Sequence, residues 1–239
     1  DTLAERVFAP WVDMASAMRQ AGIPLFSLES KRPLKDFDVI GFSLGYELTY
    51  TNILNMLDLA DVPVFANERT DAHPLVIAGG SGSLNPEPMA DFIDLFVVGD
   101  GEELVLELLE VLRKRQAPRG AGSRKGLLLS LAAIPGIYVP SLYQVDYEPG
   151  ANGLFRSITP TVPEARPRIQ RRIVTKLPPP VTKPVVPYIE VVHDRGAVEI
   201  QRGCSNGCRF CQAGYIYRPV RARPHAEVID AVGEILSNC

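Results

Sequence analysis

The sequence predicts an α/β protein that opens with a parallel sheet and ends with a separate strand, loop and helix. In the first half, short apolar runs that end in glycine alternate with stretches of helical periodicity, as they do in doubly wound sheets. Near the carboxyl end, a half-buried strand pattern leads into a cysteine-rich loop and then a helix. A proline-rich stretch separates the two parts. We therefore expect a Rossmann-like (flavodoxin-like) parallel sheet domain, a connector and a second domain.

The first domain is expected over residues 1–116. Its strands are predicted as short apolar runs, at 25–28, 37–44, 75–80 and 95–99. Its helices are predicted from apolar residues three and four positions apart, at 11–21, 46–61 and 104–116. The last of these helices is acidic at its start and basic at its end, which is the charge distribution that the helix dipole favours.

A connector is expected over residues 117–190. It is predicted to hold a turn-rich break, a strand, a small β-hairpin and a linker with recurrent prolines, at 117–123, 136–140, 142–158 and 159–188. The linker should be extended because proline suits neither helices nor central strands. It carries a basic run, Arg166, Arg168, Arg171, Arg172 and Lys176. These side chains form either a solvated face or a contact for RNA or another polyanion.

The composition is that of an ordinary globular protein. The 239 residues are 46% hydrophobic and 22% charged, and the net charge of −3 argues against a protein coated in positive charge for nucleic acid. The apolar runs fall far short of the roughly 18 to 20 residues that span a bilayer, and the amino terminus lacks a signal-peptide pattern. We therefore expect a cytoplasmic protein with no membrane partner.

Three of the four cysteines lie in one short loop, with the spacing Cys204-x-x-x-Cys208-x-x-Cys211. Residues 196–201 alternate apolar and polar side chains, so the loop should follow the carboxyl end of a strand, where α/β folds place their chemistry. Three thiolates so close in sequence indicate one metal centre. Gly203 and Gly207 are typical of a loop whose backbone approaches a cofactor closely.

Two kinds of metal centre are compatible with these thiolates. A structural zinc site usually has four protein ligands, and the fourth would be Cys239, His225 or His193. Such a site would make the chain a non-catalytic interaction or regulatory module. An iron–sulfur cluster is also held by thiolates, and three of them on a cluster of four irons leave one iron open. The absence of a second cysteine pair favours the cluster.

The cysteine loop resembles the signature of the radical S-adenosylmethionine (radical SAM) enzymes, Cys-x-x-x-Cys-x-aromatic-Cys, with Phe210 at the aromatic position. The resemblance implies that Cys204, Cys208 and Cys211 bind a [4Fe–4S] cluster whose fourth iron binds SAM, and that Phe210 packs near the adenosine. Cleavage of SAM would start radical chemistry, with an electron donor such as flavodoxin or ferredoxin. It also implies that residues 191–239 are the first strand, loop and helix of a partial (β/α) barrel.

The glycine turns of the first domain have two explanations. Gly79, Gly80, Gly99 and Gly101 belong to tight strand-to-helix turns that any doubly wound sheet needs. They also resemble the turns that line the cofactor crevice of the cobalamin-binding domains before many radical SAM barrels. Cobalamin binding stays open, because the Asp-x-His-x-x-Gly signature whose histidine ligates cobalt is incomplete around His73.

The order of the parts resembles one uncharacterised bacterial subfamily of such proteins, over nearly the whole chain. The resemblance rests on residues 85–88, 99–102, 136–140 and 202–219. It implies an opening strand before the chain and further strand–helix units after it, so we expect a fragment that is inactive by itself. The reaction would be a radical one on an RNA or protein substrate, with methyl or methylthio transfer among the options.

Overall fold

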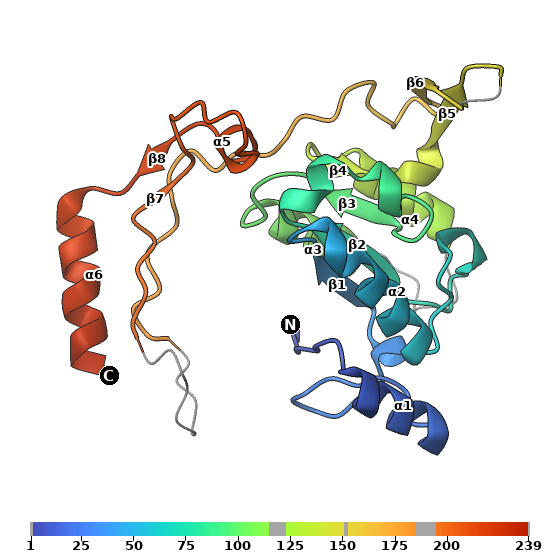
Figure 1. Cartoon of the computed structure of the whole chain (residues 1–239), viewed down its shortest axis with the longest axis horizontal. Helices are drawn as coiled ribbons and strands as arrows, with labels where there is room; N and C mark the ends of the chain where they lie inside the picture. The colour runs from blue at the N-terminus through green and yellow to red at the C-terminus, as the bar shows by residue number, and fades with distance from the viewer. Residues whose placement is uncertain (1, 115–122, 151–152, 185–194, 239) are drawn as a thin grey trace. The chain divides into compact units, whose positions relative to one another are not determined.

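The computed structural model describes residues 2–114, 123–150, 153–184 and 195–238. The chain divides into two compact units, Asp1–Ile173 and Val174–Cys239. The first unit contains the larger sheet, and the second contains the cysteine loop (Figure 1). In the described part of the chain, no helix has the length and apolar character needed to cross a membrane.

The first unit is built on a four-stranded sheet with the strand order β1-β2-β3-β4. The strands β1 (Val39–Ser43), β2 (Leu75–Gly79) and β3 (Leu95–Val97) are parallel neighbours, as the apolar runs predicted. The strand β4 (Ile137–Tyr138) pairs antiparallel with β3, which the sequence did not predict. The result is a mixed α/β fold, compatible with a Rossmann-like domain.

The described residues of the first unit also form four α-helices. The helices α1 (Val12–Ala21), α2 (Tyr50–Leu59) and α3 (Leu104–Lys114) lie where helical periodicity predicted them, whereas α4 (Arg124–Ala132) was not predicted. α1 ends at Gly22, whose φ of 63° gives the left-handed cap that glycine adopts without strain. Short 3-10 helices connect the elements, at Leu34–Asp36, Glu47–Thr49, Ala66–Glu68, Ser81–Leu84, Glu87–Met89 and Pro140–Leu142.

The unpredicted helix α4 explains the unpredicted direction of β4. The helix begins at Ser123, whose hydroxyl accepts a hydrogen bond from the amide of Gly126. The helix α3 carries the chain back from the carboxyl end of β3, and α4 returns it to that end. A strand that follows such a helix pair must run antiparallel to β3, whereas a single crossover helix would have made it parallel.

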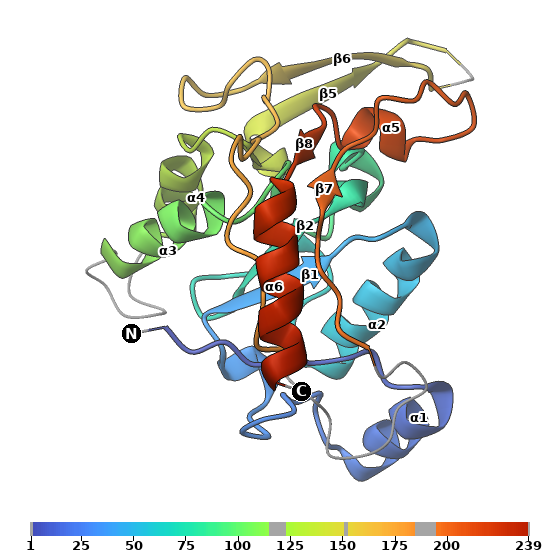
Figure 2. The ribbon, with the colours of Figure 1, turned by 90° about the vertical axis from the view of Figure 1, so that its left-hand side faces the viewer.

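Successive side chains of the strands point to opposite faces of the sheet and belong to two buried hydrophobic clusters, one on each face. Val76 and Phe96 pack toward α1 and α2, whereas Leu75 and Leu95 pack toward α3 and α4. Figure 2 shows α2 on one side of the sheet and α3 and α4 on the other. The sheet is therefore covered on both faces, which explains why β3 is buried along its whole length.

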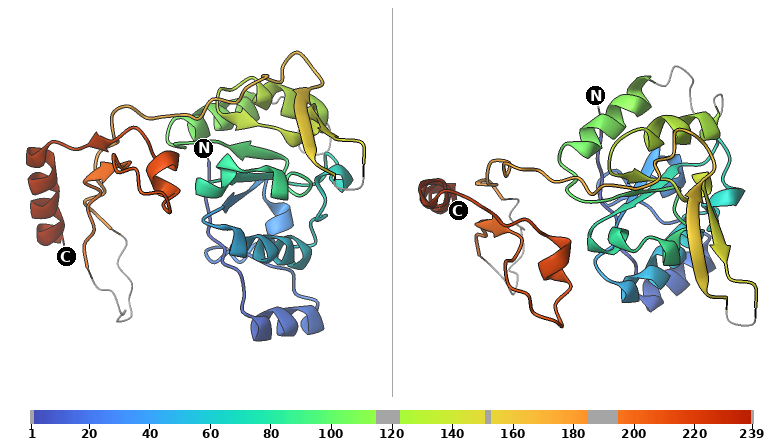
Figure 3. Two further views of the ribbon diagram at one scale, coloured as in Figure 1. Left: turned by 45° about the horizontal axis from the view of Figure 1, so that its top comes forward. Right: turned by 90° about the horizontal axis from the view of Figure 1, so that it is seen from above.

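The expected β-hairpin is confirmed. The strands β5 (Tyr143–Tyr147) and β6 (Phe155–Pro160) pair antiparallel and project from the first unit (Figure 3). The strand expected at 25–28 is reduced to an isolated bridge between Phe26 and Pro33. The stretch expected as a connector contributes α4, β4 and the hairpin to the first unit.

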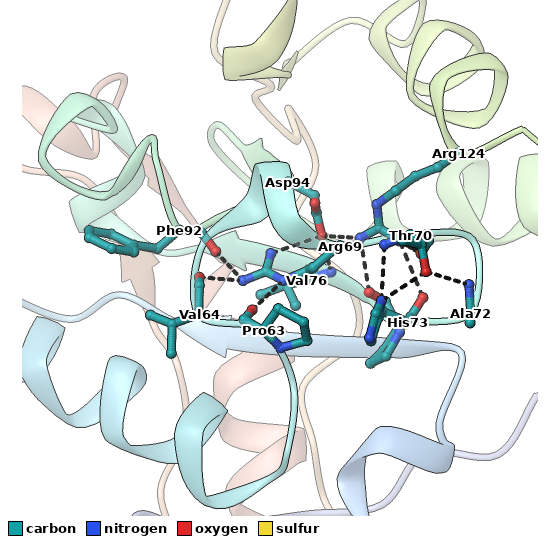
Figure 4. Close-up of polar contacts among 11 residues, drawn as sticks. Pro63, Val64, Arg69, Thr70, Ala72, His73, Val76, Phe92, Asp94 and Arg124 are labelled. Carbon is teal, nitrogen blue, oxygen red and sulfur yellow. Dashed lines mark hydrogen bonds and ion pairs between the residues drawn. The ribbon is translucent and has the colours of Figure 1, made fainter.

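A buried ionic cluster, defined by Asp94, Arg69 and Arg124, lies at the amino-terminal edge of the sheet (Figure 4). Asp94 directly precedes β3, and its Oδ2 accepts a hydrogen bond of 2.7 Å from the amide of Val76 in β2. The same oxygen lies 3.2 Å from a guanidinium nitrogen of Arg69 and 2.6 Å from one of Arg124. The cluster thus links two parallel strands to α4.

The Arg69 side chain has no exposed surface, and its burial lowers its pKa while Asp94 opposes that shift. Its remaining donors reach backbone carbonyl oxygens, those of Pro63, Val64 and Phe92. A buried guanidinium with several hydrogen bonds and a carboxylate partner is the arrangement in which a buried charge is tolerated.

The described residues of the second unit form two short strands and two helices. The strands β7 (Gln201–Arg202) and β8 (Arg221–Ala222) pair antiparallel, and the helices are α5 (Ala213–Ile216) and α6 (His225–Asn238). The helix α6 confirms the helix predicted after the cysteine loop. The strand expected at 196–201 is shorter than predicted, and β8 and α5 are too short to leave a periodic signal. No parallel strand pair lies in the described part of this unit, so the partial barrel stays a prediction.

Candidate functional site

The cysteine loop begins at Gly203, directly after β7. Gly203 has a φ of 86°, and a Cβ atom there would lie 2.6 Å from the carbonyl oxygens of both Tyr217 and Pro219. Any side chain would therefore displace the segment that leads into β8. This close approach fixes the point at which the chain enters the loop, one residue before Cys204.

The three cysteines are free thiols that follow one another around this loop. Cys204 and Cys211 are half-buried, and Cys208 is exposed. The amide of Cys211 donates a hydrogen bond of 3.1 Å to the carbonyl oxygen of Cys208, which closes a turn between them. Gly214 at the start of α5 packs against the loop, because a Cβ atom there would lie 3.1 Å from the carbonyl oxygen of Asn206.

The loop does not gather these thiols around a single point. Among the described residues, no three Cys, His, Asp or Glu side chains form a group that could hold one metal ion. Of the fourth ligands expected for zinc, His225 is the exposed first residue of α6, and His193 and Cys239 lie outside the described residues. A mononuclear site with the expected ligands is therefore not assembled in this part of the chain.

Phe210 lies between two of the cysteines, with 92% of its surface exposed. An exposed aromatic ring offers a flat apolar face to a ligand or partner. Its position beside Cys211 is compatible with a planar ligand at the loop. The contact of Phe210 with the adenosine of SAM stays a prediction.

Arginines dominate the charge around the loop. Residues 200–226 contain no Asp or Glu and five arginines, Arg202, Arg209, Arg218, Arg221 and Arg223. This local charge is opposite in sign to the net charge of −3 of the whole chain. A positively charged surrounding favours thiolate ligands over thiols and stabilises an anionic cluster.

Two carboxylates at the borders of this stretch hold the inner arginines in place. Glu199 accepts a hydrogen bond of 2.7 Å from Nε of Arg202, and this bond lowers the pKa of Glu199 against a smaller opposing effect of burial. The buried Arg223 donates to the carbonyl oxygen of Glu199 and pairs with Glu227, at 2.7 Å in each case. Sequence reasoning missed this support, although the acid-free stretch between Glu199 and Glu227 was a visible signal.

The outer arginines are exposed. Arg218 places its guanidinium 4.7 Å from the ring centroid of Tyr215, within the range of a cation–π contact. Arg209 lies between Cys208 and Phe210 and is also exposed. The exposed side of the loop therefore combines positive charge with aromatic surface.

In the first unit, two of the four glycines proposed for a cobalamin crevice are required by the packing of the chain itself. Gly80 has a φ of 98°, and a Cβ atom there would lie 2.8 Å from the carbonyl oxygen of Leu44. Gly99 has a φ of 109°, and a Cβ atom there would overlap the carbonyl oxygen of Arg172. Both close approaches are to polypeptide, so neither glycine leaves a vacant cradle.

The remaining cobalamin residues give no more support. Cβ atoms at Gly79 and Gly101 would have only ordinary contacts, with nearest neighbours at 3.6 and 3.8 Å. Nδ1 of His73 lies 2.9 Å from the amide nitrogen of Thr70 and accepts its hydrogen bond within the same turn. Cobalamin binding at these glycines therefore stays a prediction.

Comparison with known proteins identifies the family. A family model described as the N-terminal part of radical SAM proteins matches residues 1–140. The chain belongs to the radical SAM proteins. The match covers more than half of the chain and lies within the first unit, whereas the cysteine loop lies beyond it. Radical SAM proteins in general use SAM and an iron–sulfur cluster, and the match itself gives no information on cobalamin.

A curated relative extends the similarity beyond residue 140. The uncharacterized protein MJ0966 of Methanocaldococcus jannaschii is 26% identical over 216 residues, which cover 87% of this radical SAM chain. The aligned part spans 37% of the length of the archaeal protein. Because the chain spans only part of the length of this relative, the activity of the whole protein is a proposal.

Proposed function

We propose that this chain is part of a radical SAM enzyme in which Cys204, Cys208 and Cys211 hold a [4Fe–4S] cluster. The observation that carries the proposal is the coincidence of the family match with three free thiols in one loop directly after a strand. In such a cluster each thiolate binds a different iron, so the sulfurs need not converge on one point. The open loop is compatible with that wider spacing.

Each of the residues around the loop has its own role in this proposal. The cluster, when bound, supplies an electron for the cleavage of SAM to a 5′-deoxyadenosyl radical. Gly203 lets the loop pass against the segment before β8, and Glu199 holds Arg202 at the base of the loop. Phe210 offers its exposed ring to the adenosine, and the surrounding arginines balance the negative charge of the ligands.

The proposal names the substrate and the electron donor by chemical class. A one-electron carrier such as flavodoxin or ferredoxin would reduce the cluster. Methyl transfer, methylthiolation and hydrogen abstraction on an RNA or protein substrate are the reactions that the family resemblance implies. The residues that would choose among them are not identified in the described part of the chain.

Anaerobic reconstitution tests the proposal directly. Protein incubated with iron and sulfide should turn brown and retain about four irons and four sulfides per chain. Reconstitution in the presence of equal iron and zinc should give the same cluster. A colourless protein that holds one zinc per chain under these conditions would favour a regulatory zinc module and remove the basis for catalysis.

The two loop glycines offer a matched pair of variants. Gly203→Ala should lower cluster content severalfold, because alanine at a positive φ costs about 1 to 3 kcal/mol and its Cβ atom would displace two carbonyl groups. Gly207→Ala should leave the content unchanged, since a Cβ atom at Gly207 meets no atom within 4 Å. Iron analysis after reconstitution measures both. Similar losses in the two variants would show that the close approach at Gly203 does not shape the loop.

Cleavage of SAM should be slow or absent in these 239 residues. A displacement of the reacting groups by about 1 Å can cost roughly a hundredfold in rate, so SAM must be enclosed and held. The described part of the second unit offers two short strands and two helices for that purpose. The measurement is 5′-deoxyadenosine formed after reduction with dithionite, compared with an active radical SAM enzyme assayed in parallel. Equal yields would contradict this expectation.

A further inference from the structure

Arg172 occupies a slot at the carboxyl end of β3. Its amide donates a hydrogen bond of 2.9 Å to the carbonyl oxygen of Val98, and its carbonyl oxygen accepts one of 3.0 Å from the amide of Asp100. Arg172 thus pairs with the turn at Gly99 as a parallel strand of one residue. Both of its backbone polar groups are satisfied there.

Two glycines make room for this residue. A Cβ atom at Gly99 would overlap the carbonyl oxygen of Arg172, and one at Gly136 would lie 2.5 Å from its Cγ atom. Both glycines have positive φ angles, 109° and 91°. The slot is therefore shaped by two separate segments of the first unit around one residue of the linker.

Two carboxylates bind the guanidinium of Arg172. One of its nitrogens lies 2.6 Å from Glu107 and 3.2 Å from Glu103, at the start of α3. The slot thus clamps the backbone and the side chain of the same residue. In open α/β sheets this edge is where cofactors usually bind.

The second unit is anchored to the chain only two residues later. Val174 is buried, and its carbonyl oxygen accepts a hydrogen bond of 2.8 Å from the guanidinium of Arg221 in β8. The strand β8 pairs with β7, which leads into the cysteine loop. Between the two anchors lies Ile173, which is 38% exposed.

We infer that the slot formed by Val98, Gly99, Asp100 and Gly136 binds the chain's own Arg172 in place of a corrin, so that the carboxyl end of β3 takes up no cobalamin. Arg172 is held by the slot, and the carbonyl oxygen of Val174, two residues later, is held by Arg221. The inference does not depend on a cluster in the cysteine loop.

Residue-resolved amide hydrogen exchange on the whole chain tests the slot. The amides of Arg172 and Asp100 should exchange at least tenfold more slowly than the amide of Ile173. The double variant Glu103→Gln/Glu107→Gln should lose about threefold to tenfold of this protection, because partly exposed ion pairs contribute modestly. Glu110→Gln is the matched control, since Glu110 lies on the same helix and pairs with Lys114 instead.

Two results would overturn the inference. The first is an Arg172 amide that exchanges as fast as that of Ile173 in the unaltered protein. The second is binding of hydroxocobalamin, added at high micromolar concentration, with loss of protection at Arg172 and Asp100. Unchanged protection and no binding in the presence of hydroxocobalamin would support it. Thermal unfolding of each variant shows whether the first unit remains folded.

Discussion

Replacement of Cys204, Cys208 or Cys211 with alanine is expected to abolish incorporation of the [4Fe–4S] cluster. Each thiolate would be the sole protein ligand of one iron, so its loss leaves that iron without a protein bond. Iron and sulfide analysis after anaerobic reconstitution gives the loss, and electron paramagnetic resonance of the reduced protein gives the type of cluster.

Cys239→Ala is the control for this series, because it removes a thiol from outside the loop. Its iron content should equal that of the unaltered protein. Loss of the cluster in this variant as well would mean that four thiolates bind the metal. No iron would then be left open for SAM, and the proposed mechanism would be wrong.

Replacement of Asp94 with alanine should destabilise the first unit by about 3 to 5 kcal/mol, the usual cost of removing one partner of a buried ion pair. The change leaves the fully buried Arg69 and the nearly buried Arg124 without their shared carboxylate. It also removes the acceptor of the Val76 amide. The free energy of unfolding in urea measures the effect.

Asp58→Ala provides the comparison at the surface. Asp58 pairs with Arg19, and both side chains are about half exposed. The expected cost is below about 1 kcal/mol. If the Asp94 and Asp58 variants unfold at the same urea concentration, the buried cluster does not hold the sheet together.

Local sequence patterns predicted the parts of the fold that depend on local physics. The strands β1, β2 and β3 were found because each is an apolar run covered on both faces and ended by a turn. The helix α4 was missed because three of its leucines form a continuous run between Gly126 and Ser130, without a helical spacing, and follow a turn-rich stretch. The direction of β4 depends on that helix, so it could not be predicted without it.

In the candidate site, too, the features that depend on local sequence could be predicted and those that depend on distant residues could not. The spacing of three cysteines and an aromatic residue is a local signal, and the sequence alone is enough to indicate the loop. The partners of Arg172 lie more than sixty residues away along the chain, at Glu103 and Glu107. The basic run around Arg172 predicted a solvated face or a polyanion contact, because no local pattern shows that one member of the run is clamped.

The buried ionic cluster lies at the amino-terminal edge of the parallel sheet. Sequence changes at the carboxyl-terminal edge should therefore disturb the sheet less than changes at the amino-terminal edge. The charges of Asp94 and Arg69 hold the strands at their amino ends, and they do so without help from the turns at the opposite end. Loops at the carboxyl ends of the strands can therefore be lengthened or exchanged without loss of the anchor that keeps the strands in register. In the turn after β1, Leu44 is buried and its carbonyl oxygen accepts a hydrogen bond from the amide of Gly82, whereas a Cβ atom at Gly45 would meet no neighbour, so a new binding loop would be inserted after Gly45.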